Sequence, residues 1–229
     1  MRRWPLVLSL LAAPACSGLD EGEGGVVAIE VETPEFLTLE VGEQVQVVAR
    51  ALDANGRAVD APISWRAASG VVTVDAAGIV TGAVPGDVEV QAAVGALTSE
   101  PLSFEVLAPA DTIIIAGDSV FAIPVGVDPP ATARLTVRLE SFNPPGLLDA
   151  RPVIFEITRP VPGATPVVQL AGGVQSDTVT TAADATAFVD ASAVSGQVPP
   201  DTAIVEVRAE RTRGAAVPGS GQRFILLFQ

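Results

Sequence analysis

Short runs of alternating apolar and polar residues, separated by tight turns, constrain what this chain can fold into. In residues 61–94, the apolar side chains of Ile63, Trp65 and Ala67 alternate with polar neighbours. A period of two indicates a β-strand with one buried face, so Trp65 is expected to point into a core. Gly78 then provides a turn, because glycine tolerates positive φ. The segment predicts short strands packed against a core.

The same alternation recurs along the chain, and no stretch shows a helical period. Aromatic residues make up only 4% of the sequence, so the cores must consist mainly of valine, isoleucine, leucine and alanine. Asn55-Gly56 is typical of a hairpin turn. The predicted strands lie within residues 27–31, 45–49, 63–67, 72–74, 79–81, 88–94, 102–106, 112–115, 120–127, 135–139, 153–157, 177–181, 186–191, 204–209 and 223–228.

Several motifs in the first half occur in a fixed order and carry a family resemblance. They are Leu39-Glu40-Val41-Gly42-Glu43, Val45-Gln46-Val47, Ser64-Trp65, Val74-Asp75, Gly78-Ile79-Val80-Thr81-Gly82 and Pro85-Gly86-Asp87-Val88. Together they resemble the bacterial immunoglobulin-like domain, group 2, over about residues 26–106. The chain departs from that family at residues 66–69, where the family more often has a serine- and asparagine-rich run. The resemblance implies a β-sandwich.

The second half carries a weaker resemblance to the invasin-type bacterial immunoglobulin-like domain, group 1. The residues concerned are 179–187 and 203–209. That family usually has glycine where Ala185 stands, to make a turn. The two resemblances together imply an all-β chain with two tandem immunoglobulin-like β-sandwiches, at residues 26–107 and 111–229.

The first 25 residues are typical of an export signal followed by a tether. Arg2 and Arg3 precede an apolar run that is too short to span a bilayer, and small residues lead to Cys16. We therefore expect a signal peptide at residues 1–15 and a flexible acidic tether at 16–25. The arrangement resembles a bacterial lipoprotein signal, which implies that Cys16 is lipidated. Ordinary signal-peptidase cleavage before a free Cys16 is the alternative, and the protein would then be secreted.

The composition excludes several functions. The 27 acidic residues outnumber the 13 basic residues, a balance that repels nucleic acid and anionic lipid headgroups. Membrane attachment must then come from the N-terminal lipid alone. The chain lacks histidine, tyrosine and lysine. It therefore lacks the bases of Ser-His-Asp, Cys-His and Ser-Lys catalysis and the common ligands of zinc. We predict no enzyme activity, no catalytic residues and no cofactor.

The residue types permit two further possibilities, a calcium site and a glycoside hydrolase. Calcium is the only plausible metal, and Asp111, Asp118, Asp128 and Asp149 lie near predicted strand ends. No spaced calcium-binding loop motif exists, so solvated surface carboxylates are the preferred interpretation and no metal site is predicted. A carboxylate-dependent glycoside hydrolase is the one enzyme class that the composition permits, although nothing in the sequence marks two carboxylates as a pair.

The resemblances imply an exported envelope or cell-surface protein that serves in adhesion, in ligand binding or as a structural spacer. Its partner would be an envelope protein or a surface glycan, and an accessory carbohydrate-binding role is the alternative. Loops at the ends of a sandwich are the expected binding surfaces. Three proline-rich loops are candidates, at residues 143–146, 160–163 and 198–201. In lipoprotein families, a serine after the lipidated cysteine is compatible with sorting to the outer membrane. Ser17 therefore favours the outer membrane as the destination.

The lipoprotein interpretation predicts the mass of the mature N-terminus. We expect mass spectrometry of the envelope-extracted protein to show a chain that begins at Cys16 and carries the added mass of acyl groups. A Cys16→Ser variant should lose that mass. A mature chain with unmodified Cys16 would contradict lipidation while leaving export intact.

Overall fold

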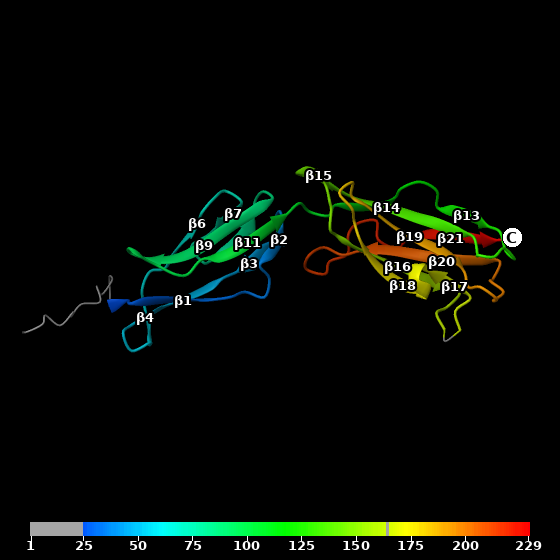
Figure 1. The fold of residues 1–229 in the computed structure, drawn as a ribbon. Helices are drawn as coiled ribbons and strands as arrows, with labels where there is room; N and C mark the ends of the chain where they lie inside the picture. The colour runs from blue at the N-terminus through cyan, green and yellow to red at the C-terminus, as the bar shows by residue number, and fades with distance from the viewer. Residues whose placement is uncertain (1–24, 164) are drawn as a thin grey trace, which may run out of the picture.

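The computed structural model describes residues 25–163 and 165–229 and forms two β-sandwiches arranged end to end (Figure 1). The predicted signal peptide, the lipidation site Cys16 and all but the last residue of the tether lie outside the described residues. The last strand of the first sandwich ends at Leu107, and the first strand of the second begins at Thr112. The described residues contain no α-helix, in keeping with the predicted all-β class.

The first sandwich is built from two layers of short strands. One layer pairs β2–β11–β9, with β6 and β10 also on β9. The other contains the ladders β1–β4–β5 and β3–β8–β7. The strands are β1 Ala28–Glu32, β2 Thr38–Glu40, β3 Gln44–Gln46, β4 Val48–Leu52, β5 Ala58–Val59, β6 Ser64–Ala67, β7 Val72–Val74, β8 Ile79–Gly82, β9 Gly86–Val94, β10 Leu97–Thr98 and β11 Leu102–Leu107.

The second sandwich has longer strands in two five-stranded sheets. One sheet has the order β12–β14–β19–β17, with β15 on β14, and the other has the order β13–β21–β20–β16–β18. The strands are β12 Thr112–Ile115, β13 Val120–Ile123, β14 Thr132–Phe142, β15 Pro145–Leu147, β16 Pro152–Arg159, β17 Val168–Leu170, β18 Ser176–Thr180, β19 Thr186–Ala193, β20 Thr202–Ala209 and β21 Gln222–Phe228.

Both sandwiches share one topological feature. A short strand near the start of each domain pairs in parallel with the last strand, β2 with β11 and β13 with β21, while the remaining pairs are antiparallel. The early edge strand thus crosses to the sheet that holds the last strands. Two sheets that exchange an edge strand in this way have the strand order of immunoglobulin-like sandwiches.

The inward side chains of each sandwich form its own core. In the first, Leu39 and Phe104 are fully buried, and Trp65 is half-buried against the same cluster. In the second, the rings of Phe155 and Phe224 stack with centroids 6.5 Å apart. Burial alternates along β11, β14 and β16, as the sequence pattern predicts. The cores are thus aliphatic with a few phenylalanines, which is what a chain so poor in aromatic residues permits.

Aspartate side chains fix the tight turns between strands. Asp75 Oδ1 accepts hydrogen bonds from the backbone N–H groups of Ala77 and Ile79, each at 2.9 Å. Asp53 Oδ1 accepts the N–H groups of Arg57 and Asn55 in the Asn55-Gly56 hairpin. These backbone hydrogen bonds lower the pKa of Asp53, because they stabilise the ionised carboxylate. The turns are therefore specified locally, before any long-range contact forms.

Some details differ from the sequence-based expectations. The apolar run 120–127 forms a strand only as far as Ile123, since Gly126 takes φ 75° and Pro124 ends the strand. Residues 143–146 do not form a long loop, because Pro145–Leu147 folds back on β14 as strand β15. The expected strand near 45–49 is interrupted at Val47, whose N–H donates to the Gly78 carbonyl instead.

Ala185 explains how the second sandwich turns without the expected glycine. Its φ is 63°, in the left-handed region that alanine rarely adopts, and its methyl group is fully buried. The left-handed conformation costs an alanine about 1–2 kcal/mol. Burial of the methyl group contributes about 0.8 kcal/mol in the opposite direction. The buried methyl group therefore offsets a large part of the strain.

The turn at Gly78 generates a stability prediction with a matched control. Gly78 and Gly56 have similar φ, 82° and 73°, but a Cβ at Gly78 would overlap the Val47 carbonyl oxygen and lie 3.0 Å from the Trp65 ring, whereas at Gly56 it meets nothing. We expect Gly56→Ala to lower the free energy of unfolding by about 1 kcal/mol. Gly78→Ala should lower it by about 3 kcal/mol or more. Urea denaturation measures both, and equal effects would contradict the packing described for Gly78.

Candidate functional site at the domain junction

A buried glutamate lies where the two sandwiches meet. Glu40 is the last residue of β2 and pairs with Leu107, the last residue of β11. The chain leaves β11 at that point and enters the second domain, so Glu40 lies beside the interdomain linker. Its exposed fraction is 0%, which is unusual for an ionisable residue unless it is paired.

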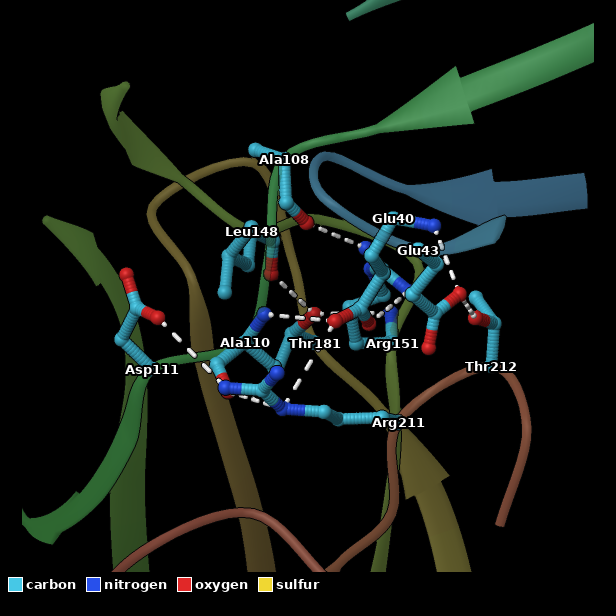
Figure 2. Close-up of polar contacts among 10 residues, drawn as sticks. All are labelled: Glu40, Glu43, Ala108, Ala110, Asp111, Leu148, Arg151, Thr181, Arg211 and Thr212. Atoms are coloured by element: carbon cyan, nitrogen blue, oxygen red, sulfur yellow. Dashed lines mark hydrogen bonds and ion pairs between the residues drawn. The ribbon is translucent and has the colours of Figure 1, made fainter. Parts of the chain in front are cut away.

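Two arginines of the second sandwich surround this carboxylate (Figure 2). Arg151 Nη1 lies 3.3 Å from Glu40 Oε1, and Arg211 Nε lies 3.8 Å from Oε2. The backbone N–H of Ala110, in the linker, donates to Oε2 at 3.2 Å. The carboxylate of one domain is thus held by the linker and by two separate segments of the other domain.

Arg151 is fixed in place by its own backbone. It directly precedes β16, and its N–H donates to Thr181 Oγ1 while its carbonyl accepts the Thr181 N–H. The guanidinium also donates from Nη2 to the Ala108 carbonyl of the linker at 2.7 Å. Its side chain is only 11% exposed. Arg151 therefore contacts both the linker and Glu40.

The loop between β20 and β21 supplies the second set of contacts. Arg211 also donates from Nε to the Ala110 carbonyl, and Thr212 Oγ1 donates to Glu43 Oε2 at 3.0 Å. Arg213 donates to the Gln44 carbonyl, and its guanidinium lies 5.2 Å from the ring centroid of Phe36. Phe36, Glu43 and Gln44 all belong to the first sandwich. Three consecutive residues of one domain thus contact the other domain or the linker.

The charges at the junction are balanced. Asp111 Oδ1 lies 3.5 Å from Arg211 Nη2, so the cluster holds two carboxylates and two guanidinium groups. Removing a charge from water costs several kcal/mol per ion unless partners replace the solvent. Glu40 Oε1 has no hydrogen-bond partner within the described residues and interacts only with the charge of Arg151. The arrangement is therefore sensitive to small displacements of either domain.

A groove of about 330 Å³ lies beside this cluster, lined by residues of both domains that include Arg151 and Asp149. Asp87 and Glu105, directly opposite each other on β9 and β11, also line it. Both carboxylates are exposed and the groove is open to solvent. Like charges facing each other across a strand pair are destabilising rather than catalytic in themselves.

The four aspartates considered for calcium are not brought together. Asp111 pairs with Arg211 and accepts the Phe142 N–H at 2.7 Å. Asp149 lines the groove at the junction, Asp118 is exposed between β12 and β13, and Asp128 lies in the loop after β13. Among the described residues, no group of three or more acidic or cysteine side chains could hold a metal ion.

The sequence did not reveal the junction. In the sequence, Glu40 is part of the motif Leu39-Glu40-Val41-Gly42-Glu43, and nothing local marks it as buried. One signal existed: two of the 13 basic residues in the sequence, Arg211 and Arg213, lie two positions apart in the segment between the predicted strands 204–209 and 223–228. Such a cluster in an acidic chain indicates a contact with carboxylates, although it does not say which ones.

Comparisons with known proteins gave matches among solved structures. No protein-family model matches the chain, and no curated protein matches it in sequence. The chain matches the adhesin InvE of Yersinia pseudotuberculosis at 17% identity and a TM-score of 0.42, covering 91% of this chain and 61% of that one. It matches the Escherichia coli adhesin FdeC at 12% identity and a TM-score of 0.49, covering 88% and 64%.

A third match is to domains 4 and 5 of the S-layer protein SbsC, at 14% identity and a TM-score of 0.34, covering 89% of this chain and 98% of that one. The chain thus spans less than two thirds of the InvE and FdeC chains that it matches. In the described residues, no helix has the length and apolar character needed to cross a membrane.

The junction predicts that a substitution in the second domain destabilises the first. Trp4 falls in the predicted signal peptide, so Trp65 is the fluorescence reporter of the first domain in the mature protein. We expect Arg211→Ala to lower the stability reported by Trp65 by about 2 kcal/mol, since it leaves the buried Glu40 with one counter-charge.

Arg223→Ala provides the control for this measurement. Arg223 also lies in the second domain, but it pairs with Glu206 at the surface and is 63% exposed. Its loss should change the Trp65 transition by less than about 1 kcal/mol. Equal transitions for wild type and Arg211→Ala would show that the two domains unfold independently.

Proposed function

We propose that this chain is a non-enzymatic, exported protein of the bacterial envelope or cell surface that acts as a spacer of fixed geometry. Its two immunoglobulin-like sandwiches form one elongated unit, and the first belongs to the group 2 type that its motifs resemble. The role is mechanical: the protein holds whatever lies at its far end at a set distance and direction from its attachment point.

The observation that carries this proposal is the buried Glu40 between Arg151 and Arg211. An ion pair with an orphaned oxygen tolerates few geometries, because a shift of either domain separates charges that water no longer reaches. A flexible link between independent domains would instead present solvated side chains and a linker without side-chain contacts. Here Ala108 and Ala110 of the linker are both held by arginine side chains.

Attachment is the second part of the proposal. Lipid on Cys16 would anchor the chain to the envelope, with the outer membrane as the destination that Ser17 favours. The acidic tether that follows would allow the rigid unit to stand away from the membrane surface. Its partner would be an envelope protein or a surface glycan. If Cys16 carries no lipid, the same unit is secreted.

An accessory carbohydrate-binding role is less well supported. Sugar sites commonly use exposed aromatic rings for stacking, and the only tryptophan of the two sandwiches, Trp65, packs against the first core. Phe142 on β14 is 61% exposed and Phe188 on β19 is 46% exposed, and the Arg134 guanidinium lies 4.2 Å from the Phe188 ring centroid on one face. The spacer role therefore accounts for more of the described contacts than the carbohydrate-binding role does.

The spacer role is tested by measuring how narrowly the two domains are oriented. In a Cys16→Ser background, cysteines at Ser103 in β11 and Thr178 in β18 place one spin label on each domain. We expect double electron–electron resonance to give a single narrow distance distribution in the parent protein. Glu40→Gln should at least double its width, because it removes the charge that both arginines contact while preserving size.

Glu206→Gln is the control, since it neutralises a carboxylate in an exposed ion pair of the second domain. It should leave the distance distribution unchanged. A broad distribution in the parent protein would rule out the fixed spacer. A distribution that stays narrow in Glu40→Gln would assign the rigidity to other contacts.

A further inference from the structure

The sequence contains two asparagines, and the residues that follow them differ in their chemistry. Asn55 precedes Gly56, whereas Asn143 precedes Pro144. The backbone nitrogen after an asparagine is a nucleophile for the side-chain amide carbon, provided that it can give up a proton. A proline nitrogen has no proton to give, and a glycine has no Cβ to hinder the approach. Asn55 is therefore the asparagine whose side chain can react with the backbone.

The turn that holds Asn55 is open to solvent. Residues 54–58 are exposed, and a Cβ placed on Gly56 would meet no atom within 4 Å. The turn joins β4 to β5 at the end of the first sandwich that points away from the second (Figure 1). Water and hydroxide therefore reach the Asn55 amide and the Gly56 nitrogen, and the protein around them leaves room for a ring to form.

Asp53 holds this turn by accepting hydrogen bonds from consecutive residues. Its Oδ1 accepts the N–H groups of Asn55 at 2.8 Å and Arg57 at 2.9 Å, and its carbonyl oxygen accepts the Gly56 N–H at 2.9 Å. In a β-turn closed in this way, the third residue has a ψ of about 0°, which directs the next nitrogen away from its side chain. Ring closure therefore requires a rotation of the Asn55 backbone that breaks these hydrogen bonds.

We propose that Asn55 is a site of spontaneous deamidation and that Asp53 sets the rate of the reaction by restraining residues 55–57. The Gly56 nitrogen loses its proton to hydroxide and attacks Cγ of Asn55. A nitrogen–carbon bond forms, and the side-chain nitrogen takes up a proton and leaves as ammonia, which gives a five-membered cyclic imide. The reaction depends neither on the spacer role nor on the junction between the domains.

Water opens the imide in one of two ways. Cleavage of the bond between the Gly56 nitrogen and Cγ gives aspartate at position 55, and cleavage of the bond to the backbone carbonyl carbon gives isoaspartate. Overall, one water molecule is consumed and one ammonia is released, with no change in oxidation state. Both products add a negative charge, and isoaspartate also adds a methylene carbon to the path of the backbone.

The added carbon acts on a short ladder. β4 and β5 are joined by two residue pairs, Ala51 with Val59 and Leu52 with Ala58, and the length of a hairpin turn sets the register of such a ladder. Val59 packs against the small core cluster that contains Val26. Isoaspartate therefore releases β5 and Val59, whereas aspartate leaves the backbone path and the ladder intact.

The test follows the mass of the proteolytic fragment that contains Asn55. The full chain with Cys16→Ser is incubated at neutral pH and digested at intervals, beside a linear peptide with the sequence of residues 51–60. We expect deamidation at Asn55 and none at Asn143, with the folded chain at least fivefold slower than the peptide. Asp53→Ala should raise the rate in the folded chain at least fivefold, because it frees the N–H groups of residues 55 and 57.

Asp75→Ala is the matched control, because Asp75 accepts the N–H groups of Ala77 and Ile79 in another turn of the same sandwich. It should leave the rate at Asn55 unchanged, which separates local release of the turn from a general loss of stability. Conversion of the peptide without conversion of the folded parent chain would overturn the proposal. So would equal rates in the parent chain and in Asp53→Ala, or equal acceleration by Asp75→Ala.

Hydrogen exchange distinguishes the two products. The isoaspartyl form, separated by chromatography, should exchange the amides of the β4–β5 ladder at least fivefold faster than the parent chain. Asn55→Asp reproduces the charge of the aspartyl product without the extra carbon, and it should exchange as the parent chain does. Amides in the isoaspartyl form that remain as protected as in the parent chain would contradict the release of β5.

Discussion

The architecture depends on one buried carboxylate. Glu40 lies at the only point where the last strand of the first domain, the linker and the second domain converge, and it is fully removed from solvent. Burial of the charge is tolerated because Arg151, Arg211 and the Ala110 N–H replace the lost water. A charge with fixed partners restricts direction as well as separation.

The two domains fold around separate cores and contribute different groups to the junction. Each sandwich has its own aliphatic core, so neither needs the other in order to bury its strands. The contacts at the junction orient two domains that each fold around their own core. The first domain contributes carboxylates at the end of its edge strand, and the second contributes arginines from a loop and from the residue before β16. In the second domain, the parallel edge strand ends at Ile123, in the position that Glu40 has in the first domain.

Most of the fold can be predicted from the sequence, but little of the junction can. Alternation in β11, β14 and β16 is a local signal, and it predicted the inward faces correctly. The turns at Asp53 and Asp75 are local too, because aspartate oxygens bind backbone groups two and four residues ahead. Glu40 and Arg211 are separated by most of the chain, and no periodic pattern links them. The left-handed Ala185 was also missed, since its compensation comes from a core formed by distant strands.

Residual dipolar couplings distinguish two sandwiches that tumble as one body from two that reorient independently. Backbone N–H couplings are measured for both domains of the full chain in a weakly aligned medium. Because Glu40 and its partners fix the orientation of the domains, we expect one alignment tensor to fit the couplings of both domains, with equal magnitude. Two tensors of different magnitude would show that the domains reorient independently, and the buried charge at Glu40 would then have no role in setting their geometry.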